Sequence, residues 1–243
     1  VQELAPPANA GSDEALCFGD TTQLAGVGGP SYAWSPGTGL SAVDIADPLA
    51  FPSTTTTYVL QVTDSLGCIA TDSVTITVNA LPIASAGSDI SLCSGQQGSI
   101  GGSPTGPAGS TFLWAPGTGL SSTTDPNPLA APPTTTTYVV GVQDLNGCID
   151  TDTVTVNVNP LPSISAGADT SVCTGGSVQL NATGTGTFAW TPSTGLSDPN
   201  VEDPIASPTA TTTYTVTLTD SNDCSASDEV TVSVGSLPTI DAG

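Results

Sequence analysis

The feature that most constrains the fold is an internal repeat, because the sequence passes three times through the same series of motifs. Leucines in matching short linkers recur at nearly equal intervals: Leu4, Leu81, Leu161 and Leu237. A Trp, a Tyr and a Cys then keep one constant spacing in every repeat: Trp34, Tyr58 and Cys68; Trp114, Tyr138 and Cys148; Trp190, Tyr214 and Cys224. From the first Cys of each unit onward, only the segment between that Cys and the Trp varies, and the extra stretch 104–107 of the middle copy predicts a surface loop. The chain is therefore predicted to fold as a tandem array of small domains.

The repeat units are placed at residues 5–81, 82–161 and 162–238. Residues 1–4 match the last strand residue and linker of a repeat, and residues 239–243 match the start of one. We therefore expect 1–4 to be the tail of a preceding repeat and 239–243 the start of a following repeat, within a longer array.

Each unit is predicted to be all-β. Tyr58, Leu60 and Val62 alternate with polar or exposed positions, and a second alternating run follows after a turn of the kind seen at residues 144–147. An early strand precedes a central strand that carries the Trp, for which we predict a core position. About seven short strands in about 80 residues predict three tandem immunoglobulin-like β-sandwich domains in an elongated array.

Charge excludes whole classes of function. The chain has no Lys, Arg or His against 22 Asp plus Glu, which gives a formal net charge of −22. Nucleic acid and anionic membrane surfaces are excluded as partners, because binding them requires cations. No apolar run is long enough for membrane insertion. The usual acids, bases and electrophiles of enzymes are missing, and paired carboxylates would need a cleft that narrow sandwiches do not offer. We predict no enzymatic activity.

Six Cys without any His indicate disulfides in an oxidising, extracytoplasmic compartment. The simplest prediction is one bridge per repeat: Cys17–Cys68, Cys93–Cys148 and Cys173–Cys224. Strand parity supports an alternative, because the turn after the first strand and the turn before the last strand lie at opposite poles of a sandwich. Opposite poles of successive domains meet at a junction, which would give Cys17–Cys148 and Cys93–Cys224. Both pairings stay open, and we adopt the within-repeat one.

Calcium is the candidate metal, although no cofactor is required. One Asp follows Ala-Gly-x at the start of each unit and another sits at the hairpin turn, and we predict that both lie at the same pole: Asp13, Asp64, Asp89, Asp144, Asp169 and Asp220. Hard cations take several oxygen ligands, which these carboxylates and nearby carbonyls would supply. The competing interpretation is that each Asp caps a turn through its own backbone amides.

The combined motifs resemble the PKD-like, immunoglobulin-like repeats of giant Bacteroidetes cell-surface proteins. The middle copy shows them as Cys-x-Gly at 93–95, aromatic-x-Trp-x-Pro-x-Thr-Gly-Leu-Ser at 112–121, Thr-Thr-Thr-Tyr-x-Val at 135–140 and Gly-Cys at 147–148. The third copy departs from the pattern with Asp223 in place of Gly. The resemblance implies export by the type IX route and O-glycans at Asp-Ser/Thr triplets, with four candidate acceptors: Thr21, Ser65, Ser73 and Thr153.

The resulting functional hypothesis is a structural segment of an extracellular rod or filament on a bacterial cell surface, spanning distance for adhesion, gliding or contact with prey or host. The expected partners are further repeats of the same chain and copies associating side by side as a homo-oligomer. The alternative hypothesis is a carbohydrate- or surface-binding adhesin module.

Overall fold

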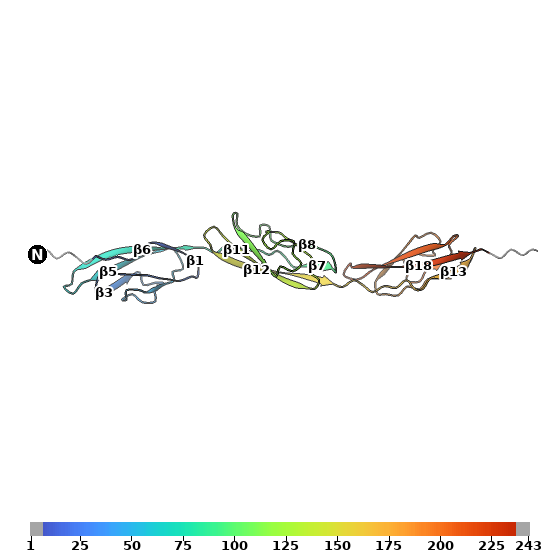
Figure 1. Ribbon diagram of the computed structural model, residues 1–243. Helices are drawn as coiled ribbons and strands as arrows, with labels where there is room; N and C mark the ends of the chain where they lie inside the picture. Colours follow the sequence, from blue (N-terminus) through green and yellow to red (C-terminus); the bar gives the residue numbers. More distant parts are fainter. Residues whose placement is uncertain (1–6, 237–243) are drawn as a thin grey trace, which may run out of the picture.

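Three β-sandwich units follow one another end to end along a single axis, which makes the molecule a rod (Figure 1). The computed structural model describes residues 7–236. All named elements in this range are strands. No helix in the range is long and apolar enough to cross a lipid bilayer.

Each unit contains six strands, close to the seven predicted. The first unit has β1 (Glu14–Cys17), β2 (Thr22–Gln23), β3 (Ser31–Ser35), β4 (Leu49–Ala50), β5 (Thr56–Thr63) and β6 (Ile69–Asn79). The second has β7 (Ile90–Cys93), β8 (Gly98–Ser99), β9 (Thr111–Ala115), β10 (Leu129–Ala130), β11 (Thr136–Gln143) and β12 (Ile149–Asn159). The third has β13 (Thr170–Cys173), β14 (Val178–Gln179), β15 (Thr187–Thr191), β16 (Ile205–Ala206), β17 (Thr212–Thr219) and β18 (Ser225–Gly235).

The strand order is the same in all three units and confirms the immunoglobulin-like sandwich. In the second unit one sheet has the order β7-β12-β11-β9, and the facing sheet is the pair β8–β10. β11 is antiparallel to both of its neighbours, whereas β7 runs parallel to β12. The first strand therefore travels in the same direction as the last one and ends at the same pole of the unit. This direction decides where the first cysteine of each unit lies.

The core is built by the period-two alternation that the sequence shows. Tyr58, Leu60 and Val62 of β5 are completely buried, as are their counterparts in β11 and β17. The three Trp side chains are 1–4% exposed, which confirms the predicted core position. Each Trp Nε1–H donates to a backbone carbonyl eleven residues ahead, such as Asp125 O at 2.9 Å for Trp114. The indole is thus buried without leaving a polar group unpaired.

The insertion of the middle unit is more than the surface loop that was predicted. Pro104 and Pro107 are exposed, but Thr105 between them is only 2% exposed. The Thr105 hydroxyl lies within hydrogen-bond distance of Pro126 O (2.8 Å) and Gly102 O (3.2 Å). The loop folds back because this hydroxyl finds carbonyl partners inside the unit, so that its burial costs little.

Candidate functional site

The candidate functional site is the junction between successive units, because the cysteines of each unit lie at its two poles. Cys17 is the last residue of β1 and is paired in register with Asn79, the last residue of β6. Cys68 comes immediately before β6 begins at Ile69. The two cysteines of one unit therefore lie at opposite ends of an 11-residue strand, about 33 Å apart at roughly 3.3 Å per residue.

The cysteines form two disulfides, and both cross a junction. Cys17 of the first unit is bonded to Cys148 of the second, and Cys93 of the second is bonded to Cys224 of the third. In both bridges the Cα atoms are 5.5 Å apart and the sequence separation is 131 residues.

The predicted within-repeat pairing Cys17–Cys68, Cys93–Cys148 and Cys173–Cys224 is therefore wrong. A disulfide requires Cα atoms within about 7 Å, and the length of the last strand separates these pairs far beyond that. The cross-junction alternative is the observed pairing, because the C-terminal pole of one unit faces the N-terminal pole of the next.

Three of the four bridge cysteines are buried, and the fourth, Cys17, is partly exposed. Cys148 and Cys224 are completely buried, and Cys93 is 7% exposed. The hairpin that carries the second cysteine is held by an aspartate, since Cys148 N–H donates to Asp144 Oδ1 at 2.9 Å. Asp220 accepts from Cys224 N–H in the same way at 3.0 Å.

Two of the six predicted disulfide cysteines remain as thiols. Cys68, at the N-terminal pole of the first unit, is partly exposed, and Cys173, at the C-terminal pole of the third unit, is exposed. Neither has a bonding partner in the part of the chain that the structure describes.

The hairpin aspartates of the calcium hypothesis act as turn caps. Asp64 Oδ1 accepts from Cys68 N–H and Leu66 N–H, each at 2.8 Å. The amide of Cys68, followed by that of Leu66, holds the pKa of the Asp64 carboxyl below its usual range. Asp144 and Asp220 accept from equivalent amides. The turn-capping interpretation is thus confirmed for these three residues.

The other three aspartates do not lie at the hairpin pole. Asp13 Oδ1 accepts from Thr75 N–H at 2.8 Å, well along β6 from the turn at Asp64. Six residues separate Thr75 from the start of β6 at Ile69, which is about 20 Å of strand. Asp89 and Asp169 accept from Thr155 and Thr231 in the same manner. The premise of a shared pole is therefore wrong, and these carboxylates tie the start of each unit to its last strand. Within residues 7–236 no three His, Cys, Asp or Glu side chains gather closely enough to hold a metal ion.

Sequence reasoning missed a second set of strand aspartates. Asp72, Asp152 and Asp228 each accept a backbone N–H from the first segment of their unit at 2.8 Å, with Ala10, Ala86 and Ala166 as donors. The amide of Ala10, followed by that of Ser73, lowers the pKa of Asp72. The signal was present, because an Asp occurs four residues after the second Cys of every unit, inside a strand where Asp is disfavoured.

The four candidate glycan acceptors are all exposed side chains. Ser65 lies in the hairpin, Ser73 and Thr153 lie on β6 and β12, and Thr21 precedes β2. Exposure leaves them accessible to a modifying enzyme, and the modification itself stays a prediction.

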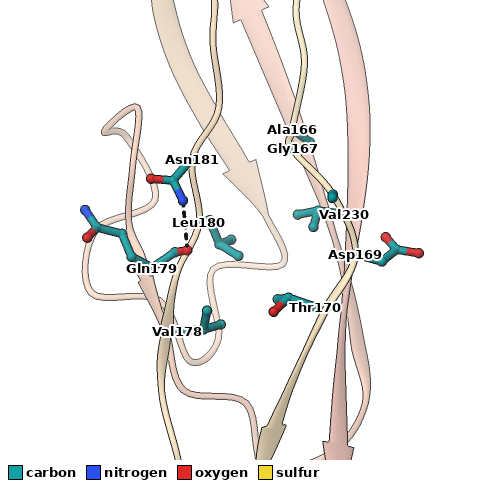
Figure 2. A pocket seen from close by; sticks show the side chains of 10 residues that line it. Ala166, Gly167, Asp169, Thr170, Val178, Gln179, Leu180, Asn181 and Val230 are labelled. Carbon is teal, nitrogen blue, oxygen red and sulfur yellow. Dashed lines mark hydrogen bonds between the residues drawn. The ribbon is translucent and has the colours of Figure 1, made fainter.

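A hollow of about 350 Å³ opens in the third unit between the segment at Ala166–Thr170 and β14 (Figure 2). It contains a single acidic residue, Asp169, whose side chain points away from Gln179 and Asn181 in this view and accepts from Thr231 N–H. An equivalent hollow of about 140 Å³ lies beside Leu24 in the first unit. The hollow is thus a recurrent seam between the two sheets, and it lacks a paired acid and base.

Comparisons with known proteins give similarity of architecture. No protein-family model and no curated protein sequence matches the chain. Among solved structures, a three-domain immunoglobulin segment of titin (I67–I69) aligns with 96% of this chain and all of its own at 13% identity and TM-score 0.44. The eight N-terminal immunoglobulin domains of Down Syndrome Cell Adhesion Molecule align over 95% of this chain and 36% of theirs, with 15% identity and TM-score 0.49. The insect immune protein hemolin aligns over 96% and 75%, with 13% identity and TM-score 0.34. Similarities at this level carry no information about function.

Proposed function

We propose that this chain is a non-catalytic structural segment of an extracellular rod or filament on a bacterial cell surface, which holds a functional partner at a distance for adhesion, gliding or contact with prey or host. The observation that carries the proposal is the pair of disulfides that cross successive junctions. Their presence also supports an oxidising compartment.

The two disulfides form an interleaved cross-link between residue 17 and residue 224. One route crosses the first bridge and follows residues 148–224, and another follows residues 17–93 and crosses the second bridge. Each of these routes bypasses 131 residues of chain. A third route crosses both bridges and is shorter still, because it contains only residues 93–148. A pulling force therefore meets a shortened covalent path, and loss of either bridge leaves one shortened route complete.

Composition supports service outside the cell. Without Lys or Arg the chain has no trypsin cleavage site, and without cations it contains no salt bridge that changes in salt concentration would weaken. Many of the aspartates accept hydrogen bonds from backbone N–H groups and thereby hold turns and strands together. This structural use of the carboxylates supports a non-catalytic role. The resemblance to repeats of giant Bacteroidetes surface proteins supports the bacterial origin and the type IX route.

Single-molecule force spectroscopy with a handle at each terminus tests the load-bearing role. A variant without the first bridge (Cys17→Ser with Cys148→Ser) or without the second (Cys93→Ser with Cys224→Ser) should unfold to a length short of the unbridged chain. The shortfall is the 131 bypassed residues, roughly 450 Å at about 3.3–3.6 Å per residue. The oxidised wild-type chain should be slightly shorter than either variant, because its shortest route crosses both bridges. Only the quadruple variant should extend fully.

The reduced wild-type chain is the control for the quadruple variant and should match its length. The proposal fails if the oxidised wild-type chain already extends to the length of the reduced one, or if loss of one bridge alone releases the full length.

The adhesin alternative has one observation in its favour. The outer face of the middle unit carries exposed Leu113 (64%) and Ile149 (55%) around Gly141, and the equivalent third-unit residues are Ala189, Ser225 and Thr217. These aliphatic side chains line a shallow hollow of about 300 Å³. A glycan array and a surface-adsorption assay of wild type against Leu113→Ser would reveal such binding. Equal, background-level signals from both proteins would remove the alternative.

A further inference from the structure

The three units meet only at their ends, with little non-covalent contact between them (Figure 1). Each of the three hydrophobic clusters contains residues of one unit only, and every sheet lies within one unit. Within residues 7–236, the backbone hydrogen bonds outside the strands also connect groups of the same unit. Without a large apolar interface, neighbouring domains of a chain ordinarily move relative to one another.

The linkers do not supply the missing interface. Leu81 and Leu161, the linker leucines of the two junctions, are 40% and 49% exposed, and Ile83 beside the first linker is 80% exposed. An apolar interface would bury such side chains, because full burial of a Leu or Ile contributes about 1.5–3 kcal/mol. Each linker is therefore a tether between two units rather than part of a packed interface.

A second tether lies beside the linker at the first junction. The chain leaves the first unit after Asn79, and Cys17 is the register partner of Asn79 on the neighbouring strand β1, about 5 Å away across the sheet. On the far side, Ala84 N–H donates to Asp150 Oδ2 at 3.3 Å, two residues after Cys148. The incoming chain is thus held beside the strand that carries the other half of the bridge, and linker and disulfide form a short ring across the junction.

The second junction is built in the same way. Cys93 is the register partner of Asn159, after which the chain leaves the second unit. In the third unit Ala166 N–H donates to Asp228 Oδ2 at 2.8 Å, four residues after Cys224. Both junctions therefore have two covalent connections close to each other, the linker and the disulfide.

Two connections constrain a joint far more than one. A single tether lets the next unit bend in any direction and twist about the rod axis. A second tether a few ångströms away stops the twist and leaves bending only about the line that joins the two connections. The short stretch between Asn79 and Ala84 leaves little slack for that motion. The disulfide supplies this restriction without any packed interface between the units.

We propose that each junction disulfide is an orientation lock: while the bridge is closed, consecutive units keep one fixed bend and twist, and when it is open they reorient about the linker. Each unit stays folded in both states, because its hydrophobic cluster is separate from those of its neighbours. The proposal goes beyond the proposed function, since the stiffness of the rod and the length of its covalent path are different properties.

Small-angle X-ray scattering of the oxidised chain tests the lock at physiological salt, where charge repulsion between units is screened beyond about 8 Å. All bridge variants also carry Cys68→Ser and Cys173→Ser, so that the remaining thiols cannot cross-link copies. In the quadruple variant, which lacks both bridges, the radius of gyration should fall by roughly 10–30%, because free joints let units about 36 Å long fold towards one another. Cys68→Ser with Cys173→Ser alone is the control and should keep the radius of gyration of monomeric wild type.

Residual dipolar couplings measured by NMR assign the motion to one junction. With both bridges closed, the three units should fit one common alignment tensor. Loss of the first bridge alone (Cys17→Ser with Cys148→Ser) should give the first unit a tensor of its own, while the second and third units still share one. Loss of the second bridge alone (Cys93→Ser with Cys224→Ser) should separate the third unit instead.

Three results would refute the lock. The first is a quadruple variant that keeps the radius of gyration and the common tensor of the bridged protein, because packing then fixes the orientation. The second is a bridged protein whose units already align independently. The third is a unit that unfolds when its bridge is lost, seen as collapse of its amide chemical-shift dispersion.

Peptide mapping with a protease that cleaves after acidic residues separates these failures from failure of the proposed function. If both bridges are found and the lock is refuted, the shortened covalent path still stands. If either bridge is absent from the oxidised wild-type chain, both proposals fail.

Discussion

At the scale of single residues, the fold uses carboxylates as hydrogen-bond acceptors because it has no cations to pair them with. Asp72 and Asp228 accept the amides of Ala10 and Ala166, which join the first segment of a unit to its last strand. The ionised form makes the stronger hydrogen bond, so the pKa of both carboxyls lies below the usual range. A group with a depressed folded pKa stabilises the protein above the unfolded pKa, and this contribution is lost as the pH falls through the folded value.

Asp72→Asn should therefore destabilise the first unit at neutral pH and lose that effect in acid. Between about pH 4, near the unfolded pKa, and pH 2, the stability difference between wild type and variant should shrink. Urea unfolding followed by hydrogen exchange of first-unit amides measures this difference. Asp44→Asn is the matched control, since Asp44 is exposed and accepts no hydrogen bond from residues 7–236. A pH-independent difference for Asp72→Asn would contradict the prediction.

The buried tyrosines make a second residue-scale contribution. The Tyr138 hydroxyl donates to Thr118 O at 2.7 Å from a completely buried ring, and burial raises the pKa of this phenol. Tyr138→Phe should destabilise the middle unit by about 1–2 kcal/mol, because the carbonyl loses its buried donor. Native-state hydrogen exchange of β11 and β12 measures the loss. Unchanged protection would show that water replaces the hydroxyl.

Calcium removal should leave the molecule unaffected. The hairpin aspartates are satisfied by backbone amides, and the aspartates at the start of each unit lie about 20 Å away along the last strand. The melting temperature with a chelator should equal that with added calcium in differential scanning calorimetry. A rise on adding calcium, absent with magnesium, would restore the calcium hypothesis.

At the scale of elements, the last strand of each unit is the one that pairs with both the first strand and the preceding strand of its sheet. β6, β12 and β18 are 11 residues long, pair on one side with a parallel first strand and on the other with an antiparallel strand, and set the length of the unit. Because the parallel partner ends where the last strand ends, the first cysteine is carried to the C-terminal pole.

The middle strand of the second unit contains a weak point. Gly141 lies in β11 where the other units have Gln61 and Thr217, and a Cβ there would meet only Leu113 O at 3.7 Å. Gly141→Thr should stabilise the unit by about 1 kcal/mol, since a glycine inside a strand costs backbone entropy and packs no side chain. Slower exchange of second-unit amides would show it. The reverse change, Gln61→Gly, should destabilise the first unit by a similar amount.

At the scale of the whole molecule, charge opposes association between rods. The net charge of −22 is spread along the array, and like charges on parallel rods repel each other over the Debye length. Side-by-side bundling should therefore be absent at low ionic strength and appear as salt shortens that length to about 8 Å at physiological strength, or when divalent cations are added. Light scattering against salt concentration measures the effect. Assembly that is as strong in millimolar salt with chelator as in physiological salt would contradict it.

Local features of the fold were predictable from the sequence. The alternation of Tyr58, Leu60 and Val62 placed these side chains inside, and the Asp-x-x-Gly hairpin and the core Trp were identified at their observed positions. The third hairpin kept its shape with Asp223 in place of Gly, at φ 60°, because Asp tolerates the left-handed region better than most residues. Such features depend on neighbours within a few positions, which a sequence displays directly.

Non-local partners were decided only by the tertiary structure. Strand parity left two cysteine pairings open, and the parallel pairing of β1 with β6 selected the cross-junction one. The same pairing of strands separated Asp13 from Asp64. Thr105 is buried because its hydroxyl contacts the carbonyl of Pro126, a residue distant in the sequence. By itself, the repeat in the sequence determined what each unit is and that units follow one another. Strand parity indicated that the two cysteines of a unit could lie at opposite poles, but only the direction of the first strand in the tertiary structure decided it, and with it the covalent joining of the units.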